Sequence, residues 1–302
     1  MKIAIAGGTG FIGSKLTKLL TANGHSIFIL TRDPSNRPEQ SNVRYVKWLQ
    51  QSDSTTEELE GIDAIINLAG ESIGSGRWTK ERKNRILQSR IQSTQAITNL
   101  IKKLSKKPSV LVNASAIGYY GNSETDTFTE HSPPVEDNFL STVVQSWEQE
   151  AEKASEYGVR VVYCRLGVVL DKQEGALPRM LLPYKLFAGG PLGDGKQWLS
   201  WIHVDDAVRM FEFTLEHEQI KGPFNVTAPE PYRMNEFGKI VSRVINRPHW
   251  LPTPSFALKM LLGEMSTLVL DGQKVIPEKA KTHDFRYSYP ALEPALINLL
   301  KT

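Results

Sequence analysis

The chain has 302 residues, a formal net charge of +3 at pH 7, 40% hydrophobic residues, 22 Gly and 17 Pro. This composition is typical of a soluble globular protein and excludes a disordered, collagen-like or coiled-coil chain. Basic and acidic residues alternate along the sequence, so no basic tract predicts a nucleic-acid partner. The length predicts one large α/β domain with an appended lobe, or two domains.

Three features predict the cellular setting. The single cysteine, Cys164, lies in an apolar run and is expected to be a buried strand residue in a protein of a reducing compartment. The apolar start is interrupted at Gly7, which argues against a signal peptide. No apolar run approaches the ~18 residues of a membrane span. We therefore expect a cytoplasmic protein with no membrane partner.

Short apolar runs alternate with helical patterns through the first two thirds of the chain. This alternation predicts βαβ units and a mostly parallel sheet whose strands are covered by helices on both faces. The expected strands are Lys2–Ala6, Ser26–Thr31, Val43–Trp48, Ala64–Leu68, Val110–Ala114 and Val159–Arg165. The expected helices between them are Phe11–Asn23, Lys80–Ser105 and Phe139–Glu156.

After about residue 170, clusters of Gly and Pro separate shorter elements. Helices are expected at Asn235–Ile245, Phe256–Leu270 and Leu292–Leu300. We predict a nucleotide-binding domain over 1–170 plus about 200–222. The smaller substrate lobe then comprises 171–199 and 223–302.

The first expected strand runs directly into a glycine-rich segment and then into an amphipathic helix. Gly7 would permit a tight turn, Gly10 would let the backbone approach a pyrophosphate, and Gly13 would let the helix pack closely on the strand. The anion would lie at the helix N-terminus, where free N–H groups and the helix dipole favour negative charge. The alternative is a purely structural turn. The predicted cofactor-binding residues here are Gly7, Thr9, Gly10, Phe11, Ile12 and Gly13.

The end of the second strand predicts which dinucleotide is bound. An acidic residue there would bind the ribose 2′-hydroxyl, whereas an arginine accommodates a 2′-phosphate. Thr31 and Arg32 occupy the discriminating positions and favour NADP(H), although Asp33 follows directly. The alternative is that Arg32 is an ordinary solvated residue.

Several motifs together resemble extended short-chain dehydrogenase/reductases, and within them the atypical subgroup called epimerase family proteins. The segment Trp201–Ala207 is similar to the wider superfamily. The marks of the subgroup are Leu68–Glu71, Ser89–Ile91, Ser115–Gly121, Trp147–Glu148 and Leu270–Pro277, the last similar to a small C-terminal domain of unknown function. The resemblance covers essentially the whole chain.

The resemblance implies a Rossmann-like core that binds NADP(H), with the substrate site between this core and the C-terminal lobe. Leu68, Ala69 and Gly70 would flank the nicotinamide-side ribose. Arg90 stands where typical members carry an Asn, and an Arg is the usual departure in this subgroup. Its guanidinium could reach a phosphate or a substrate carboxylate and cannot act as a general base. Arg90 and Ser115 are counted among the predicted cofactor-binding residues. The residues expected to line the nicotinamide end are Arg165, Gly167 and Val168.

Hydride chemistry in the parent superfamily uses a Tyr-x-x-x-Lys pair one helical turn apart. The matching positions here fall on Leu140 and Val144, so the usual catalytic pair is missing. Ser115 is retained and could hydrogen-bond a substrate oxygen. Tyr119 or Tyr120 could donate a proton, although packing under the loop is an equally good account of either ring.

Other acidic and histidine side chains are weaker candidates for a catalytic or metal-binding role. Glu71 and Glu148 are candidate acids or bases, with a helix cap or a solvated charge as the alternative. His203 lies at a strand-to-helix junction, where Asp205 or Asp206 is expected to be the N-cap rather than half of a catalytic pair. The six histidines show no metal-binding spacing, so no metal is predicted.

Substrate signals are sparse. Basic and aromatic side chains of the lobe could bind a nucleotide-sugar or another carbonyl or hydroxyl compound, or they could belong to a solvated rim and a packed lobe. These residues are Arg179, Lys185, Lys196, Trp198, Trp201 and Trp250. The oligomeric state, monomer or homodimer, stays open.

The first functional hypothesis is an NADP(H)-binding oxidoreductase or epimerase-like enzyme. The second is a non-catalytic NADP(H)-dependent binding or regulatory protein, which the missing Tyr-Lys pair favours. A third is an interaction protein that keeps a Rossmann-like fold without its ligand.

Overall fold

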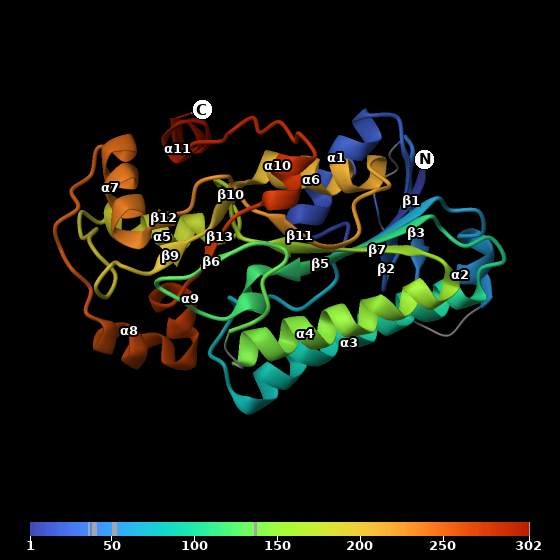
Figure 1. Cartoon of the computed structure of the whole chain (residues 1–302), viewed down its shortest axis with the longest axis horizontal. Helices are drawn as coiled ribbons and strands as arrows, with labels where there is room; N and C mark the ends of the chain where they lie inside the picture. The colour runs from blue at the N-terminus through green and yellow to red at the C-terminus, as the bar shows by residue number, and fades with distance from the viewer. Residues whose placement is uncertain (36, 38–40, 50–52, 136–137, 302) are drawn as a thin grey trace.

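A seven-stranded parallel sheet forms the centre of the molecule (Figure 1). The computed structural model describes residues 1–35, 37, 41–49, 53–135 and 138–301. The strand order is β11-β7-β5-β4-β1-β2-β3, and every neighbouring pair is parallel. The strands are β1 (Lys2–Ala6), β2 (Ser26–Thr31), β3 (Val43–Lys47), β4 (Ala64–Asn67), β5 (Val110–Ala116), β7 (Arg160–Leu166) and β11 (Gly222–Val226).

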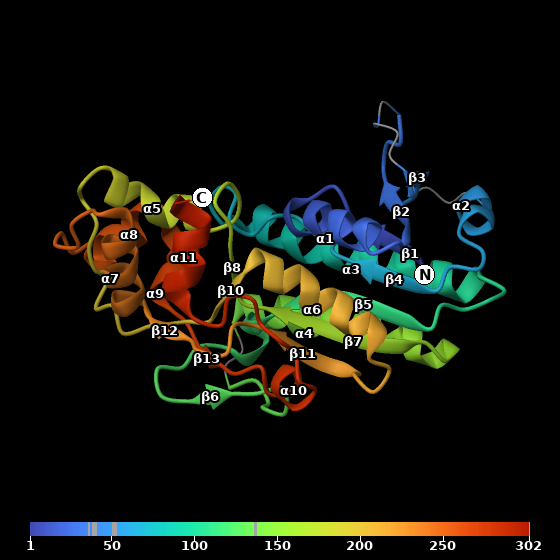
Figure 2. The same ribbon diagram turned by 90° about the horizontal axis from the view of Figure 1, so that it is seen from above.

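Helices cover both faces of this sheet (Figures 1 and 2). Ile3 and Ile5 of β1 pack into the hydrophobic cluster under α1 and α6. Ala4 and Ala6 pack into the cluster under α3. The covering helices are α1 (Phe11–Ala22), α3 (Lys80–Lys103), α4 (Phe139–Glu152) and α6 (Val204–Glu216), and α2 (Asp53–Glu58) lies near β3. The predicted doubly wound, Rossmann-like α/β fold is confirmed.

A smaller lobe packs around its own hydrophobic core, which α5, α7 and α11 build. The lobe contacts the loops that follow β4 and β5: Arg179 Nη1 donates to the Gly74 carbonyl, and Gln273 Nε2 donates to the Ile117 carbonyl at 2.8 Å. Its helices are α5 (Leu177–Lys185), α7 (Met234–Ile245), α8 (Ser255–Leu262), α9 (Thr267–Leu270), α10 (Glu278–Thr282) and α11 (Leu292–Lys301). The minor strands are β6 (Thr127–Phe128), β8 (Val168–Leu170), β9 (Trp198–Leu199), β10 (Trp201–His203), β12 (Tyr232–Arg233) and β13 (Lys274–Val275).

Two predicted helices are interrupted. The helix expected over Phe256–Leu270 ends at Gly263, whose φ of +60° stops α8, and a 3-10 turn, η3 (Gly263–Ser266), precedes α9. The helix expected over Phe139–Glu156 leaves α geometry after Glu152 and continues as the 3-10 turn η2 (Lys153–Tyr157). A further 3-10 turn, η1 (Ile117–Tyr120), follows β5.

The predicted division into a core and a lobe stays a proposal. Strand β11 extends to Val226 and forms an edge of the central sheet, so we place it with the core. Ala280 of α10 and Phe285 also pack into the core cluster beside α6, although they come from the end of the chain. The C-terminal segment therefore contacts both parts of the molecule.

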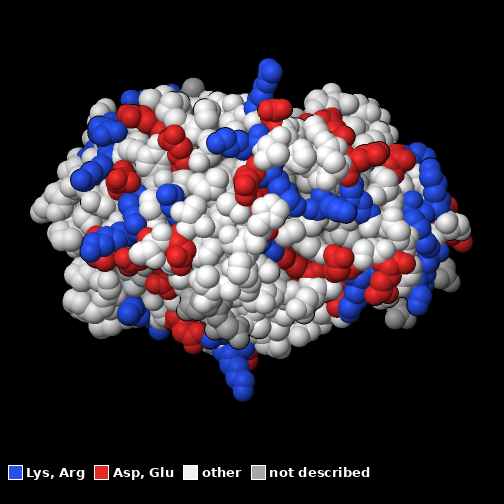
Figure 3. All heavy atoms as spheres, in the orientation of Figure 1, with Lys and Arg blue, Asp and Glu red and all other residues white. Residues whose placement is uncertain are grey.

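The surface carries mixed charge. Figure 3 shows basic and acidic side chains interspersed over the face that it draws, with a broad uncharged region between them. Within the described part of the chain, no helix combines the length and the apolar character that crossing a bilayer requires.

Candidate functional site

The glycine-rich turn between β1 and α1 excludes a side chain at two of its positions, Gly7 and Gly13. Gly7 has a φ of +78°, and a Cβ there would lie 2.8 Å from the carbonyl carbon and oxygen of Leu68. A Cβ on Gly13 would lie 2.1 Å from the Gly7 carbonyl oxygen. Gly10 is the N-cap of α1 and supplies no side-chain acceptor, so no side chain caps the N–H groups of the first turn. The turn is therefore shaped to receive an anion.

The neighbouring strands bring further predicted residues to this turn. Because β1 pairs in parallel with β2 and with β4, their carboxyl ends meet on either side of the glycine turn. Thr31 and Arg32 follow on one side. On the other side lie Leu68, Ala69 and Gly70. Phe11 and Ile12 begin α1 and are partly buried, whereas Thr9 is exposed.

At the end of β2, the acidic residue Asp33 is engaged by local hydrogen bonds. Asp33 accepts a hydrogen bond from the backbone N–H of Ser35 at 2.9 Å, and these Ser35 contacts lower the pKa of the Asp33 carboxyl. The Thr31 hydroxyl donates to the Asp33 carbonyl at 3.1 Å. Arg32 is exposed and forms no ion pair with any described carboxylate. Its guanidinium is available to a ligand.

At the end of β5, Ser115 belongs to a buried polar cluster. Its hydroxyl donates to Glu148 Oε1 at 2.5 Å. Arg165, at the matching position of β7, donates to the same carboxylate through Nε at 2.8 Å and Nη2 at 2.7 Å. Burial alone would lower the pKa of Arg165, but Glu148 more than offsets this effect and holds it above its usual value. The pair is a fixed ion pair, since the side chains are 2% and 8% exposed.

The two candidate tyrosines have different surroundings. Tyr120 is fully buried, donates from its hydroxyl to Asn225 Oδ1 at 2.7 Å, and has its pKa raised to about 12 by burial. Tyr119 is partly buried, and its ring centroid lies 3.4 Å from the guanidinium carbon of Arg165. Of the two, Tyr119 is the one that solvent reaches.

Helix α4 contains neither tyrosine nor lysine. Leu140 packs in an apolar cluster with Met265 and Leu268 of the C-terminal segment, and Val144 is buried. Both positions that we matched to the catalytic pair are therefore occupied by packing residues.

Arg90 is partly buried between the end of β4 and α4. Its Nη1 donates to the carbonyl oxygens of Glu71 and Ile86, each at 3.0 Å, and its guanidinium carbon lies 5.0 Å from the Trp147 ring centroid. A Cβ on Gly70 would lie 3.3 Å from that guanidinium carbon. The structure thus brings Arg90, Gly70 and Trp147 together.

The remaining candidates have structural roles in the fold. The expectation that Asp205 or Asp206 caps α6 is wrong: His203 is the N-cap, and its Nδ1 accepts from the Asp205 N–H at 3.1 Å. Asp206 is buried and accepts instead from the N–H groups of Ser288 and Tyr289, both at 2.8 Å. A buried aspartate satisfied by a later segment has no reason to cap its own helix.

Comparison with known proteins identifies the family. Residues 3–227 match the model of the NAD dependent epimerase/dehydratase family, and residues 253–299 match a domain of unknown function (DUF1731). The chain belongs to the NAD dependent epimerase/dehydratase family. It is 50% identical over 300 residues to the epimerase family protein YfhF of Bacillus subtilis, covering 99% of this chain and 98% of that protein. The predicted resemblance to atypical extended short-chain dehydrogenase/reductases is confirmed.

Two solved structures have folds similar to that of this chain. The human epimerase family protein SDR39U1, solved with NADPH, is 33% identical with a TM-score of 0.88, covering 100% of this chain and 99% of that chain. MoeE5, solved with UDP-glucuronic acid and NAD, has a TM-score of 0.79 over 100% of this chain and 98% of its own, at 18% identity. The second likeness shows the fold alone. The family therefore makes this chain an NAD(P)-binding, epimerase-like protein.

The residues of this family member fit a dinucleotide. The turn is a cradle that a Cβ at Gly7 or Gly13 would fill, and the first turn of α1 opens onto it. Lys15 of α1 forms an ion pair with Asp171 at 2.9 Å, and this pair joins α1 to the segment that leads into the lobe. Val168, predicted to line the nicotinamide end, packs partly against the core of the lobe.

The predicted aromatic stacking residues are mostly engaged in the fold. Trp201 is fully buried and donates to the Glu230 carbonyl at 2.9 Å. Trp198 lies under Arg233, whose guanidinium carbon is 3.8 Å from its ring centroid. Trp250 is 64% exposed and lies on the surface.

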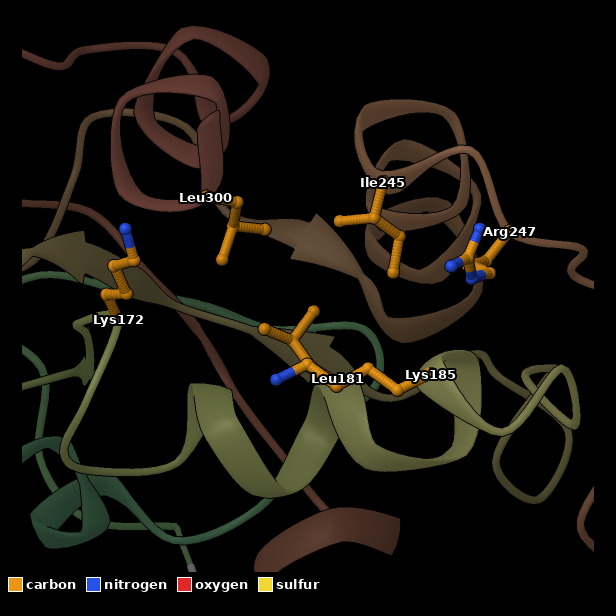
Figure 4. Close-up of a pocket in the computed structure, with 6 residues that line it drawn as sticks. All are labelled: Lys172, Leu181, Lys185, Ile245, Arg247 and Leu300. Carbon is orange, nitrogen blue, oxygen red and sulfur yellow. The ribbon is translucent and has the colours of Figure 1, made fainter. Parts of the chain in front are cut away.

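A cavity of about 270 Å³ lies elsewhere in the lobe (Figure 4). In Figure 4, Ile245 and Leu300 point toward each other across it, with Lys172 and Arg247 on opposite sides. Lys185, which we considered for substrate binding, also lines it. Lys185 ends α5, where a cation stabilises the helix dipole, and Arg247 lies just beyond the C-cap of α7. None of the residues that line this cavity belongs to the glycine-rich turn between β1 and α1.

In the described chain, no group of three or more His, Cys, Asp or Glu is placed to hold a metal ion.

Sequence reasoning missed the partnership of Glu148 with Arg165. A signal was present, because Glu148 follows Val144 by four residues and Leu140 by eight, which places all three on one face of α4. The contact of Trp147 with Arg90 was also missed, because the two residues lie on different helices and no local pattern joins them.

Proposed function

We propose that this protein binds NADP(H) and transfers a hydride to or from a carbonyl or hydroxyl compound, with the substrate between the core and the lobe. The glycine turn supports dinucleotide binding, because its shape excludes every side chain at two positions. In this proposal the pyrophosphate lies on the N-terminus of α1. Residues Leu68, Ala69 and Gly70 flank the nicotinamide-side ribose.

One observation carries the preference for NADP(H) over NAD(H). At the end of β2, Arg32 has a guanidinium without a described carboxylate partner, while the Asp33 carboxylate is held by Ser35. A 2′-phosphate would be paired by Arg32, whereas one oxygen of the Asp33 carboxylate already accepts from the Ser35 N–H. The Thr31 hydroxyl adds a neighbouring hydrogen-bonding group.

The chemistry would rest on few side chains. When bound, NADP(H) supplies the hydride donor or acceptor. Tyr119 is our candidate for exchanging the proton with the substrate oxygen, because Tyr120 and Ser115 are buried and their hydroxyls are engaged. The Arg165 guanidinium lies against the Tyr119 ring and fixes the position of this side chain.

A second candidate function is cofactor-dependent binding without turnover. The apolar Leu140 and the buried Val144 on α4 favour it, because no lysine on that helix can lower the pKa of a catalytic tyrosine. Both functions require the same cofactor. We retain a cytoplasmic location and no nucleic-acid or membrane partner in either version, with a monomer or homodimer still to be decided.

Calorimetric titration with NADPH and NADH tests the cofactor proposal. We expect NADPH to bind at least tenfold more tightly, a difference of about 1.4 kcal/mol. Arg32→Ala should remove this preference and leave NADH affinity unchanged. The matched control is Arg44→Ala, because Arg44 lies on the adjacent strand β3 and forms an exposed ion pair with Glu58. Equal affinities for the two nucleotides in the unmodified protein would overturn the proposal.

Turnover then separates the two candidate functions. NADPH oxidation is followed with a panel of aldehydes and ketones. An enzyme should show turnover that Tyr119→Phe slows at least tenfold with unchanged NADPH affinity. Tight NADPH binding with no turnover across the panel would favour the binding function.

A further inference from the structure

Two guanidinium groups flank adjacent residues of α4, and only one of them is neutralised. Arg165 pairs with Glu148 through two hydrogen bonds. Arg90 lies against Trp147, the residue before Glu148, and forms no ion pair with any carboxylate among the described residues. Both cations therefore lie next to the segment of α4 whose Glu148 accepts a hydrogen bond from Ser115.

The carboxylate whose charge acts on Arg90, that of Glu71, is paired elsewhere. Glu71 offers Arg90 its backbone carbonyl, while its side chain pairs with Arg82 and lies 3.5 Å from Arg85. Two other arginines thus lie at the Glu71 carboxylate. Burial lowers the pKa of Arg90 to about 10, and the more distant charge of Glu71 opposes this effect only in part. A partly buried cation without its own counterion is costly, unless a ligand supplies one.

The position of Arg90 is fixed from several sides. Its Nη1 is held by two carbonyl oxygens, and its flat face lies on the Trp147 ring. The Trp147 ring is itself anchored, because Nε1 donates to Thr94 Oγ1 at 3.0 Å. Gly70 has no side chain to displace the guanidinium. No described acceptor binds Nε or Nη2 of Arg90, so these donors are held in place without a partner.

We propose that Arg90 is the receptor for an anionic group of the substrate, so that this site acts on carbonyl or hydroxyl compounds that carry a carboxylate or a phosphate. The inference rests on the proposed function, which assigns the phosphates of the cofactor to α1 and Arg32. Arg90 lies instead against Trp147 of α4, the residue that precedes the glutamate to which Ser115 donates. A planar guanidinium with two free donors matches the two oxygens of such a group.

The first arm of the test separates substrate from cofactor. NADPH is titrated into the unmodified protein, Arg90→Gln, Arg90→Lys and Arg85→Gln. Arg85 is the matched control, because it is an exposed arginine on the same helix that also neighbours Glu71. We expect NADPH affinity to change less than twofold in all variants. A loss of tenfold or more in Arg90→Gln alone would assign Arg90 to the cofactor and overturn the proposal.

The second arm uses probe pairs that differ in charge. Benzoylformate and its methyl ester, and phenyl phosphate and phenol, are titrated with and without saturating NADP⁺, and tryptophan fluorescence is recorded because Trp147 lies under Arg90. We expect the charged member of each pair to bind at least tenfold more tightly. Arg90→Gln should abolish this preference, Arg90→Lys should weaken it, and Arg85→Gln should retain it.

The outcomes separate the two proposals. Absence of saturable binding of both charged probes, or a charge preference that persists in Arg90→Gln, would overturn the role of Arg90. A protein that binds no NADPH but shows the Arg90-dependent preference would refute the proposed cofactor and keep the anion receptor. If Arg90→Gln fails to fold, Arg90→Lys carries the comparison. The carboxylate and phosphate pairs show which acid the site prefers.

Discussion

Glu148 on α4 and Arg165 on β7 form a buried, two-pronged ion pair, and Ser115 donates a third hydrogen bond to the same carboxylate. The pair joins the helix to the strand that follows β5 in the sheet. It therefore holds together the elements that position the candidate site.

Replacing Glu148 with Gln should destabilise the protein strongly. The change leaves the Arg165 charge buried without compensation, which typically costs about 3 kcal/mol in the free energy of unfolding. Urea unfolding followed by circular dichroism measures this loss. Glu156→Gln is the control, because Glu156 is exposed and should change stability by less than about 0.5 kcal/mol. Similar losses of unfolding free energy in both variants would show that the buried pair contributes no more to stability than an exposed glutamate does.

Gly13→Ala and Gly10→Ala should have different effects. A Cβ at position 13 would overlap the Gly7 carbonyl oxygen, so we expect a loss of about 2 kcal/mol or more in stability. A Cβ at position 10 would lie 3.3 Å from the same oxygen, and the backbone there has an ordinary φ of −81°. Gly10→Ala should therefore fold, with a cost of about 1 kcal/mol, and lose NADPH affinity.

Urea unfolding and calorimetry together check this pair. A Gly10→Ala protein that binds NADPH as tightly as the unmodified protein would place the pyrophosphate away from this turn.

Tyr120→Phe should destabilise the fold by about 1–2 kcal/mol, because the buried Asn225 Oδ1 loses its donor. A pKa of about 12 keeps this hydroxyl neutral at physiological pH, so its role is a structural hydrogen bond. Tyr119→Phe should leave stability nearly unchanged. Urea unfolding of both variants tests the contrast, and the opposite order would contradict it.

His203 should make the protein sensitive to acid. Burial lowers the pKa of His203, and its Nδ1 must stay unprotonated to accept from the Asp205 N–H. The unfolded chain then binds a proton more readily, so stability is complete above the unfolded pKa of about 6.5 and falls as pH decreases below it. His203→Asn keeps a capping acceptor that does not titrate.

The groups facing His203 are Asp205 at 3.7 Å, Asn298 at 3.2 Å and the stacked Tyr289 ring. We expect the stability difference between about pH 7.5 and about pH 5.5 to be smaller in His203→Asn than in the unmodified protein. The exposed His131, replaced by Asn, is the control. Equal pH dependence in all three proteins would remove His203 as the cause.

The sequence by itself determined the parts of this protein that depend on neighbouring residues. The strands Lys2–Ala6 and Ser26–Thr31 have the bounds that their apolar runs predict, since strands covered on both faces need continuous apolar side chains. The spacing of Gly7, Gly10 and Gly13 likewise predicted a turn with no room for side chains, because the turn and the helix that follows it are local in the chain.

Only the tertiary structure decided which polar groups meet. The partners Ser115, Glu148 and Arg165 come from three elements, and no local pattern shows that two of them neutralise each other while Arg90 does not receive a carboxylate. The cap of α6 was mistaken for the same reason: Asp206 is satisfied by Ser288 and Tyr289, more than eighty residues later. Hydrogen bonds and ion pairs depend on distances of a few ångströms, which packing of distant segments sets.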